Sequence, residues 1–144
     1  MKHSAPNRLL YLASSILQIL IGGSALFGGY NLLTIPDGSS LDMPLSLLAE
    51  SPFTDYYVPG LLLFIGIGLF HIGGAVVSWV RFRYAGQCAF ILGFILLFWI
   101  IIQIAMIGYA SLLQPIYFIL GLAEIDLGIR WMKTSSSSIK MQQT

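Results

Sequence analysis

The sequence predicts an all-α membrane protein: a bundle of four transmembrane helices with both termini in the cytoplasm (N-in/C-in). Three observations lead to this prediction: the composition, four long apolar stretches, and the placement of the basic residues. Of the 144 residues, 57% are hydrophobic and 9% are charged, whereas about a quarter of the residues in a soluble domain carry charge. The composition therefore indicates that most of the chain lies in a membrane.

Four apolar stretches are each long enough to cross a hydrocarbon core of roughly 30 Å at about 1.5 Å per residue. They cover residues 9–30, 59–80, 85–108 and 112–131. The first follows basic residues, as a signal peptide would, but it is too long and further spans follow it, so we expect it to be retained. Short connections make the last three spans successive antiparallel neighbours. Residues 1–133 should thus form a single four-helix transmembrane domain.

The basic residues set the orientation of the chain. All seven fall before the first span, between the second and third, or at the C-terminal end, namely Lys2, Arg8, Arg81, Arg83, Arg130, Lys133 and Lys140. Residues 31–58 contain none, and carry Asp37, Asp42, Glu50 and Asp55 instead. The positive-inside rule places both termini in the cytoplasm and this acidic loop outside the cytoplasmic membrane. Residues 134–144 lack apolar content, so we expect a disordered cytoplasmic tail.

The long external loop contains one segment with helical signals. Asp42 is placed to cap a short interfacial helix whose first turn contains Pro44. Apolar side chains indicate that this segment lies on the membrane surface or covers the bundle, namely Leu41, Leu45, Leu48 and Phe53. Two interpretations stay open: a roof over the helices, or a docking surface for an extracellular or periplasmic partner.

The fourth span carries two carboxylates, Glu124 and Asp126. An ionisable residue near the centre of a span costs about 2.5 to 3.5 kcal/mol, so each needs a partner. The two side chains point about 200° apart around a helix and cannot serve one pocket together. Asp126 lies four residues before Arg130, near the cytoplasmic end. This spacing predicts an interfacial ion pair between Asp126 and Arg130.

Glu124 shares its helix face with Gly121 and Gly128, small residues that let helices approach closely, so this face should point inward. Similar stripes of small residues contain His71 in the second span and Gln18 in the first. Counted from the cytoplasmic ends, Gln18 and His71 lie about 14 Å deep and Glu124 about 10 Å deep. One layer of the bundle can therefore contain all three.

This candidate intramembrane polar cluster of Gln18, His71 and Glu124 has two interpretations. It is a proton-responsive or ligand-binding site, in which Glu124 either pairs with a protonated His71 or stays neutral. Alternatively, the three side chains hydrogen-bond one another to hold the helices together, at about 0.6 kcal/mol per contact. Gln103 lies nearer the outside on the third span, and we expect it to make a further hydrogen bond between packed helices.

The sequence lacks the motifs that several classes of enzyme and binding protein require. The sequence contains no HExxH, no metal-spaced His and Cys cluster, no phosphate-binding glycine loop and no GxSxG. We therefore predict no catalytic residue, no metal and no cofactor. The single cysteine, Cys88, excludes an internal disulfide, and no extended basic surface supports binding of nucleic acid. The expected partners are the lipid bilayer and a protein bound through the external loop, or a second copy of the chain.

The stretch from Trp99 to Tyr109, with Gln103 and Gly108 inside it, is followed by Ser111, Leu113, Gln114, Pro115 and Tyr117. Together with the Tyr57-Val58-Pro59-Gly60 start of the second span, it resembles a pattern in small, uncharacterised four-span bacterial membrane proteins. The likeness covers roughly the last 90 residues and implies no known activity. A looser likeness to the DoxX-like four-span proteins rests on size and glycine-rich helices.

Three functions compete on these observations. The leading hypothesis is a non-enzymatic integral protein of the bacterial cytoplasmic membrane that acts as an accessory, partner-binding or immunity-type protein. The second is a small, oligomeric, proton-coupled transporter that uses Glu124 and His71, as minimal four-span exporters use a buried glutamate. The third is an enzyme that modifies a lipid or an isoprenoid, with His71 and Glu124 as acid and base.

Overall fold

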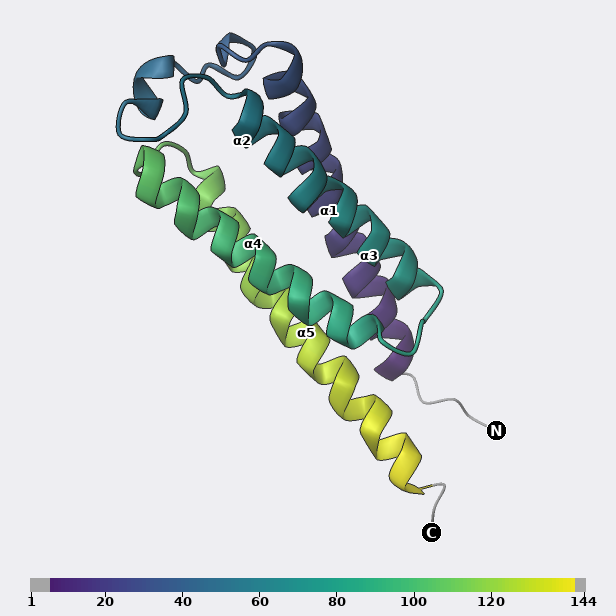
Figure 1. The fold of residues 1–144 in the computed structure, drawn as a ribbon. Helices are drawn as coiled ribbons and strands as arrows, with labels where there is room; N and C mark the ends of the chain where they lie inside the picture. Colours follow the sequence, from purple (N-terminus) through teal and green to yellow (C-terminus); the bar gives the residue numbers. More distant parts are fainter. Residues whose placement is uncertain (1–5, 142–144) are drawn as a thin grey trace.

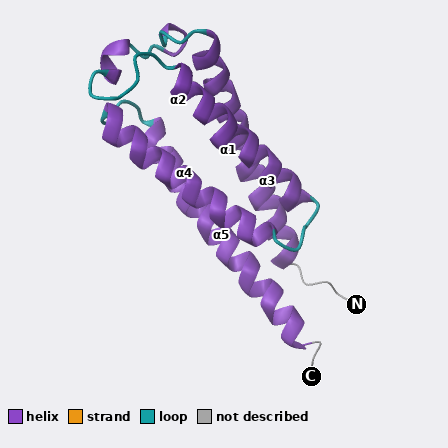
Figure 2. Cartoon of the chain, in the orientation of Figure 1, coloured by secondary structure: helices purple, strands orange, loops and turns teal. Residues whose placement is uncertain are grey.

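The computed structural model describes the backbone of residues 6–141 and the side chains of residues 8–134. Lys2, the side chain of Lys140 and the last three residues of the tail lie outside this range. The described residues form helices joined by loops and turns, without a strand (Figure 2). Three of the helices are long and apolar enough to cross a membrane: Arg8–Thr34, Tyr57–Trp79 and Ala85–Ile107. The prediction of an all-helical protein is confirmed for the described residues, and three of the four predicted spans have helices of the required length and apolar character.

The first half of the chain forms a helical hairpin (Figure 1). Helix α1 (Pro6–Thr34) runs antiparallel to one continuous helix with three parts, α2 (Tyr57–Leu62), η3 (Leu63–Leu69) and α3 (Phe70–Trp79). The η3 part is a π-helix, in which the backbone N–H bonds reach five residues back. The two backbones come close at Gly22, where a Cβ atom would lie 3.0 Å from the carbonyl oxygen of Gly68. Small residues therefore set the spacing of this hairpin.

The second half forms another hairpin, from α4 (Ala85–Ile107) and α5 (Leu113–Met141). These helices meet at two glycine pairs. A Cβ atom on Gly128 would lie 2.7 Å from the carbonyl oxygen of Gly86, and one on Gly93 would lie 2.8 Å from that of Gly121. The pairs are seven residues apart on each helix, about two turns, so they mark one face of each. Along this face the backbones are nearly in contact.

Helix α5 differs from the prediction in length. The sequence predicts a disordered tail from Thr134, but α5 continues through Met141, so the prediction is wrong for residues 134–141. No glycine or proline follows Gly128 to end the helix. Helix α5 is not one of the three helices apolar enough to span a membrane, since its apolar part carries Glu124, Asp126 and Arg130.

The loop between α1 and α2 folds over one end of the hairpins (Figure 1). It contains two short 3-10 helices, η1 (Ser39–Leu41) and η2 (Leu45–Leu48). Leu48 and Tyr56 are buried together with Leu32 of α1, and Ile107 of α4 packs against them. The buried side chains of this segment thus lie over the helices, as the interpretation as a roof expects, while Leu45 stays exposed.

Asp42 does not cap the start of a helix, so that prediction is wrong. It follows the end of η1 with a positive φ of 53°. The backbone N–H of Met43 bonds to the carbonyl of Gly38, which places Asp42 inside a turn. The next helix, η2, begins after Pro44, which makes no side-chain cap.

An apolar layer fills the middle of the bundle, where the two hairpins meet. It consists of Ile21, Ala25, Ile67, Leu96 and Ile100, all buried. Gln18 and His71 each lie about one helical turn from this layer, away from the loop. Gln103 lies on the loop side and makes no hydrogen bond within the described residues, so its predicted packing bond is absent.

Candidate functional site

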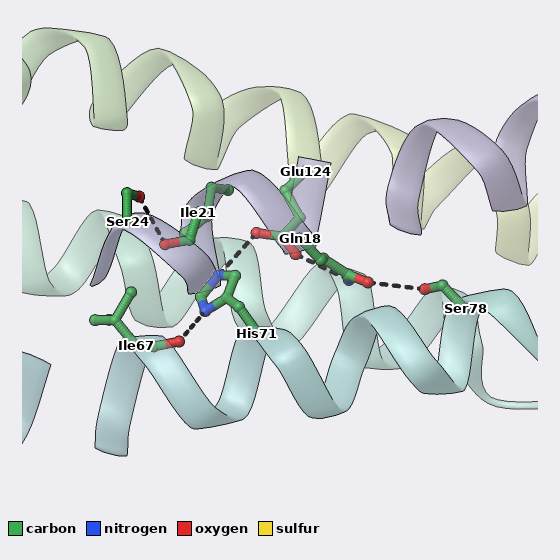
Figure 3. Close-up of polar contacts among 7 residues, drawn as sticks. All are labelled: Gln18, Ile21, Ser24, Ile67, His71, Ser78 and Glu124. Carbon is green, nitrogen blue, oxygen red and sulfur yellow. Dashed lines mark hydrogen bonds and ion pairs between the residues drawn. The ribbon is translucent and has the colours of Figure 1, made fainter. Parts of the chain in front are cut away.

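The structure brings Gln18, His71 and Glu124 together, and adds Ser78 (Figure 3). We call these four residues the polar cluster. Gln18 comes from α1, His71 and Ser78 from α3, and Glu124 from α5. All four side chains are fully buried. The cluster therefore spans the interface between the two hairpins, and the second hairpin contributes only Glu124 to it.

The Glu124 carboxylate uses both of its oxygens. Its Oε1 accepts a hydrogen bond of 3.0 Å from Nε2 of Gln18, and its Oε2 lies 3.1 Å from Nε2 of His71. The amide oxygen of Gln18 in turn accepts a 2.9 Å bond from the Ser78 hydroxyl. A continuous chain of polar contacts thus runs from Ser78 through Gln18 and Glu124 to His71.

The contact made by Nδ1 of His71 determines which atoms of His71 and Glu124 can carry protons. Nδ1 lies 2.8 Å from the carbonyl oxygen of Ile67, which only accepts, so Nδ1 must carry a hydrogen. One more proton is then needed between Nε2 of His71 and Oε2 of Glu124, because two bare acceptors at that distance repel. The proton lies on His71, giving an ion pair, or on Glu124, giving a neutral pair. Both arrangements have no net charge, which suits a site closed to water.

The π-helical part η3 ends at Leu69, two residues before His71. Single π-helical turns inside α-helices occur frequently at functional sites. Here the Phe70 N–H reaches the carbonyls of both Ile65 and Ile67. The Ile67 carbonyl therefore receives this backbone N–H as well as Nδ1 of His71. The irregular turn and the orientation of the imidazole ring are thus linked through one carbonyl group.

Gly74 makes room for the side chains of Leu92 and Gln18. A Cβ atom at Gly74 would lie 2.3 Å from Cδ1 of Leu92 and 3.3 Å from Nε2 of Gln18. Nearby, the Ser15 hydroxyl donates a 3.3 Å bond to the carbonyl of Ala75. Small residues on α3 thus let α1 and α4 approach the polar cluster closely.

Asp126 and Arg130 lie apart from the polar cluster. Nε of Arg130 donates to Oδ2 of Asp126 at 2.6 Å, and both side chains are more than half exposed. The ion pair that the spacing predicts is formed, on the outside of α5. Glu124 and Asp126 therefore lie in different environments, because their side chains point in different directions around the helix.

Sequence reasoning missed two members of the site. Ser78 lies seven residues after His71, on the same helix face, and this spacing could have indicated that it joins the cluster. The Ile67 carbonyl had no signal in the sequence, because it is a backbone group selected by the π-helical turn.

An apolar cavity lies between the hairpins, on the loop side of the polar cluster. Its volume is about 420 Å³, and side chains of α1, α2, η3, α4 and the loop line it. Ile67 belongs to both places, since it lines the cavity while its carbonyl holds His71. No group of three or more metal-ligating side chains is gathered within the described part of the chain.

Comparison with protein-family models, with curated proteins and with solved structures finds no match.

Proposed function

We propose that this chain is a four-span integral protein of the bacterial cytoplasmic membrane that acts by binding a partner and not by catalysis. The fourth span in this proposal is α5. Its exposed residues Ile116, Ile119 and Leu122 are apolar, which suits a face against lipid. Its carboxylate at Glu124 is buried and hydrogen-bonded inside the bundle, where an ionisable group in a span normally lies.

The proposed orientation puts both termini in the cytoplasm. Arg81 lies in the turn between α3 and α4, and its guanidinium carbon lies 3.9 Å from the centre of the Tyr11 ring near the start of α1. Arg81 therefore shares one end of the bundle with Arg8, and the acidic loop lies at the other end. This separation of charge supports an external loop under the positive-inside rule.

One observation supports the binding role: His71 and Glu124 are buried inside the bundle, whereas part of the loop is exposed. His71 and Glu124 are fully buried, and both are occupied by bonds to other groups of the chain. A substrate has no route to them in this conformation, which disfavours a lipid- or isoprenoid-modifying enzyme. By contrast, Leu45 and Ser46 in η2 are exposed. We therefore assign partner binding, of an accessory or immunity type, to the loop.

Photo-crosslinking in intact cells tests this role. A photoreactive amino acid replaces Leu45 or Ser46 in the loop, and Ile119 on the lipid-facing side of α5 in a control. We expect a discrete crosslinked protein from the loop positions and none from position 119. Absence of an adduct at both loop positions, or the same adducts from all three, would overturn the proposal.

A proton-coupled transporter is the second candidate, because one proton must be placed between His71 and Glu124. Ile67 offers a connection, since it lines the cavity and also holds the His71 ring. Proteoliposomes with an imposed pH gradient test this function by the uptake of candidate substrates. Glu124→Gln should abolish proton-coupled uptake while the protein still inserts. Uptake that continues in this variant would remove the role.

The resemblance to small four-span bacterial membrane proteins is part of this proposal. It rests on the sequence pattern alone, and it supplies no activity.

A further inference from the structure

We propose that the apolar cavity binds one acyl chain of a zwitterionic phospholipid from the outer leaflet. The cavity measures about 420 Å³, within the roughly 300 to 1,000 Å³ of ligand sites. Gly66 and Ile67 line it on one wall, Ile95 and Phe98 on the other, and Leu48 in the roof. The leaflet assignment rests on the orientation proposed above.

The side chains that line the cavity favour a hydrocarbon chain as the ligand. The lining is almost entirely apolar: Gln103 is the one lining residue with a side-chain amide and presents little polar surface there, and the hydroxyl of Tyr56 in the roof already donates to the carbonyl of Pro44. A ligand with a polar ring, such as a quinone, would leave its oxygens without partners inside this cavity, at a cost in binding. A plain alkyl chain requires no such partners and gains from burial of its methylene groups.

The length of the cavity matches one leaflet. On α4 the lining extends from Ile95 to Ile107, about 18 Å along the helix axis. On the opposite wall it extends from Pro59 to Ile67, about 12 Å. Half of a hydrocarbon core of roughly 30 Å is about 15 Å. A single acyl chain lying along the helices therefore fits between the roof and the apolar layer.

The opening of the cavity faces the lipid. Leu62 and Phe98 line the cavity and are also 49% and 64% exposed. Both residues belong to helices that are long and apolar enough to span a membrane. An opening with such edges is in contact with the acyl chains of the bilayer, so the surrounding lipid itself supplies the ligand.

The charge around the roof selects the headgroup. Asp37, Asp42 and Glu50 are exposed on the loop, and residues 31–58 contain no lysine or arginine. These carboxylates repel a headgroup with net negative charge and attract the ammonium group of phosphatidylethanolamine. The occupant is therefore a phospholipid whose phosphate is balanced by an amine.

A substitution that fills the cavity tests whether an acyl chain binds there. Gly66 lines the cavity, and a Cβ atom placed on it meets nothing within 4 Å, so Gly66→Leu adds a side chain into the open space. Gly73 lies on the same continuous helix, is exposed, and also has open space around a Cβ atom. Because Gly73 is outside the cavity, Gly73→Leu is the matched control.

The full chain is reconstituted into vesicles that contain phosphatidylethanolamine with a diazirine halfway along one acyl chain. We expect light-dependent labelling of residues 59–67 and 95–107, reduced about fivefold or more in Gly66→Leu because leucine occupies the space of the chain. Gly73→Leu should label as the wild type does. A probe with a phosphatidylglycerol headgroup should label these residues less.

Equal labelling of the wild type and Gly66→Leu, or labelling spread evenly over the exposed apolar faces, would overturn the proposal. Stronger labelling by the glycerol-headed probe would overturn the headgroup assignment. The readout does not depend on which side of the membrane the loop faces, so it can fail or succeed separately from the partner-binding role of the loop.

Discussion

Oε2 of Glu124 lies 3.1 Å from Nε2 of His71, and the two side chains come from opposite hairpins and are fully buried. Glu124 is the only residue of the second hairpin in the polar cluster. If the hairpins shifted along each other, Gln18 and His71 would both lose their bonds to this carboxylate. A buried polar contact of this kind fixes the relative position of packed helices, because every other arrangement leaves polar groups unpaired.

Glu124→Gln and Glu124→Ala should have different effects on stability. The glutamine keeps the shape, and its amide can accept from Gln18 and donate to a neutral His71, so we expect a loss below about 1 kcal/mol. The alanine leaves Nε2 of Gln18 and Nε2 of His71 buried and unpaired. We expect it to lower the free energy of unfolding by about 1 to 3 kcal/mol. Unfolding by sodium dodecyl sulfate in mixed micelles measures both values.

Asp126→Ala serves as the control for this comparison. Its ion pair with Arg130 is exposed, and such pairs contribute about 0 to 1 kcal/mol. Equal losses for Glu124→Gln and Glu124→Ala would contradict the bonding assigned to the carboxylate.

His71 should keep a hydrogen on Nδ1 in every state of the cluster, because that nitrogen faces the Ile67 carbonyl at 2.8 Å. Solid-state NMR of protein labelled with ¹⁵N at histidine measures this directly in bilayers. We expect a protonated Nδ1 signal that persists when Glu124→Gln alters the other side of the ring. A bare Nδ1 in the wild type would show that the ring has the other tautomer.

Asp37 provides a prediction outside the spans. The hydroxyl and the backbone N–H of Ser39 donate to its Oδ1 at 2.7 and 2.9 Å, and these bonds hold the pKa of Asp37 below its usual value of 3.8. A pKa that is lower in the folded chain contributes stability above the usual value, which is lost as pH falls through the folded pKa. Ser39→Ala removes the larger cause, so the pKa of Asp37 should rise. Titration followed by carboxyl ¹³C NMR measures it, and an unchanged pKa would contradict the role of the hydroxyl.

The helices and the three inward-facing polar residues could be predicted from the sequence, because both depend on local patterns. Apolar length indicates the helices, and the glycine stripe beside Glu124 indicates its inward face. Similar depth then suggests that Gln18 and His71 share its layer. Geometry of this kind identifies which residues can meet without the three-dimensional structure.

The features that the sequence did not predict depend on contacts between distant segments or on backbone irregularity. The Ile67 carbonyl enters the site through a π-helical turn, which no side-chain pattern encodes. The apolar cavity forms from α1, α2, η3, α4 and the loop together, so no single segment predicts it. Asp42 has the residue type of a helix cap, but the bond from Met43 to Gly38 places it in a turn.

The glycine pairs between α4 and α5 should be sensitive to a single methyl group. In Gly93→Ala the new Cβ atom would lie 2.8 Å from the Gly121 carbonyl oxygen and 2.7 Å from Cγ1 of Ile125, so the backbones must separate. We expect a loss of about 1 to 3 kcal/mol in the free energy of unfolding, as for other overpacked sites.

Gly23→Ala is the matched control for Gly93→Ala, because a Cβ atom on Gly23 meets nothing within 4 Å. Alanine has a higher helix propensity than glycine, so this variant should be neutral or more stable by up to about 1 kcal/mol. Unfolding by sodium dodecyl sulfate measures both variants under the same conditions. Since both substitutions add the same methyl group to a helix, their difference isolates the contact between α4 and α5. A Gly93→Ala variant as stable as Gly23→Ala would show that the two helices can separate without cost, and that their glycines do not set the packing of this hairpin.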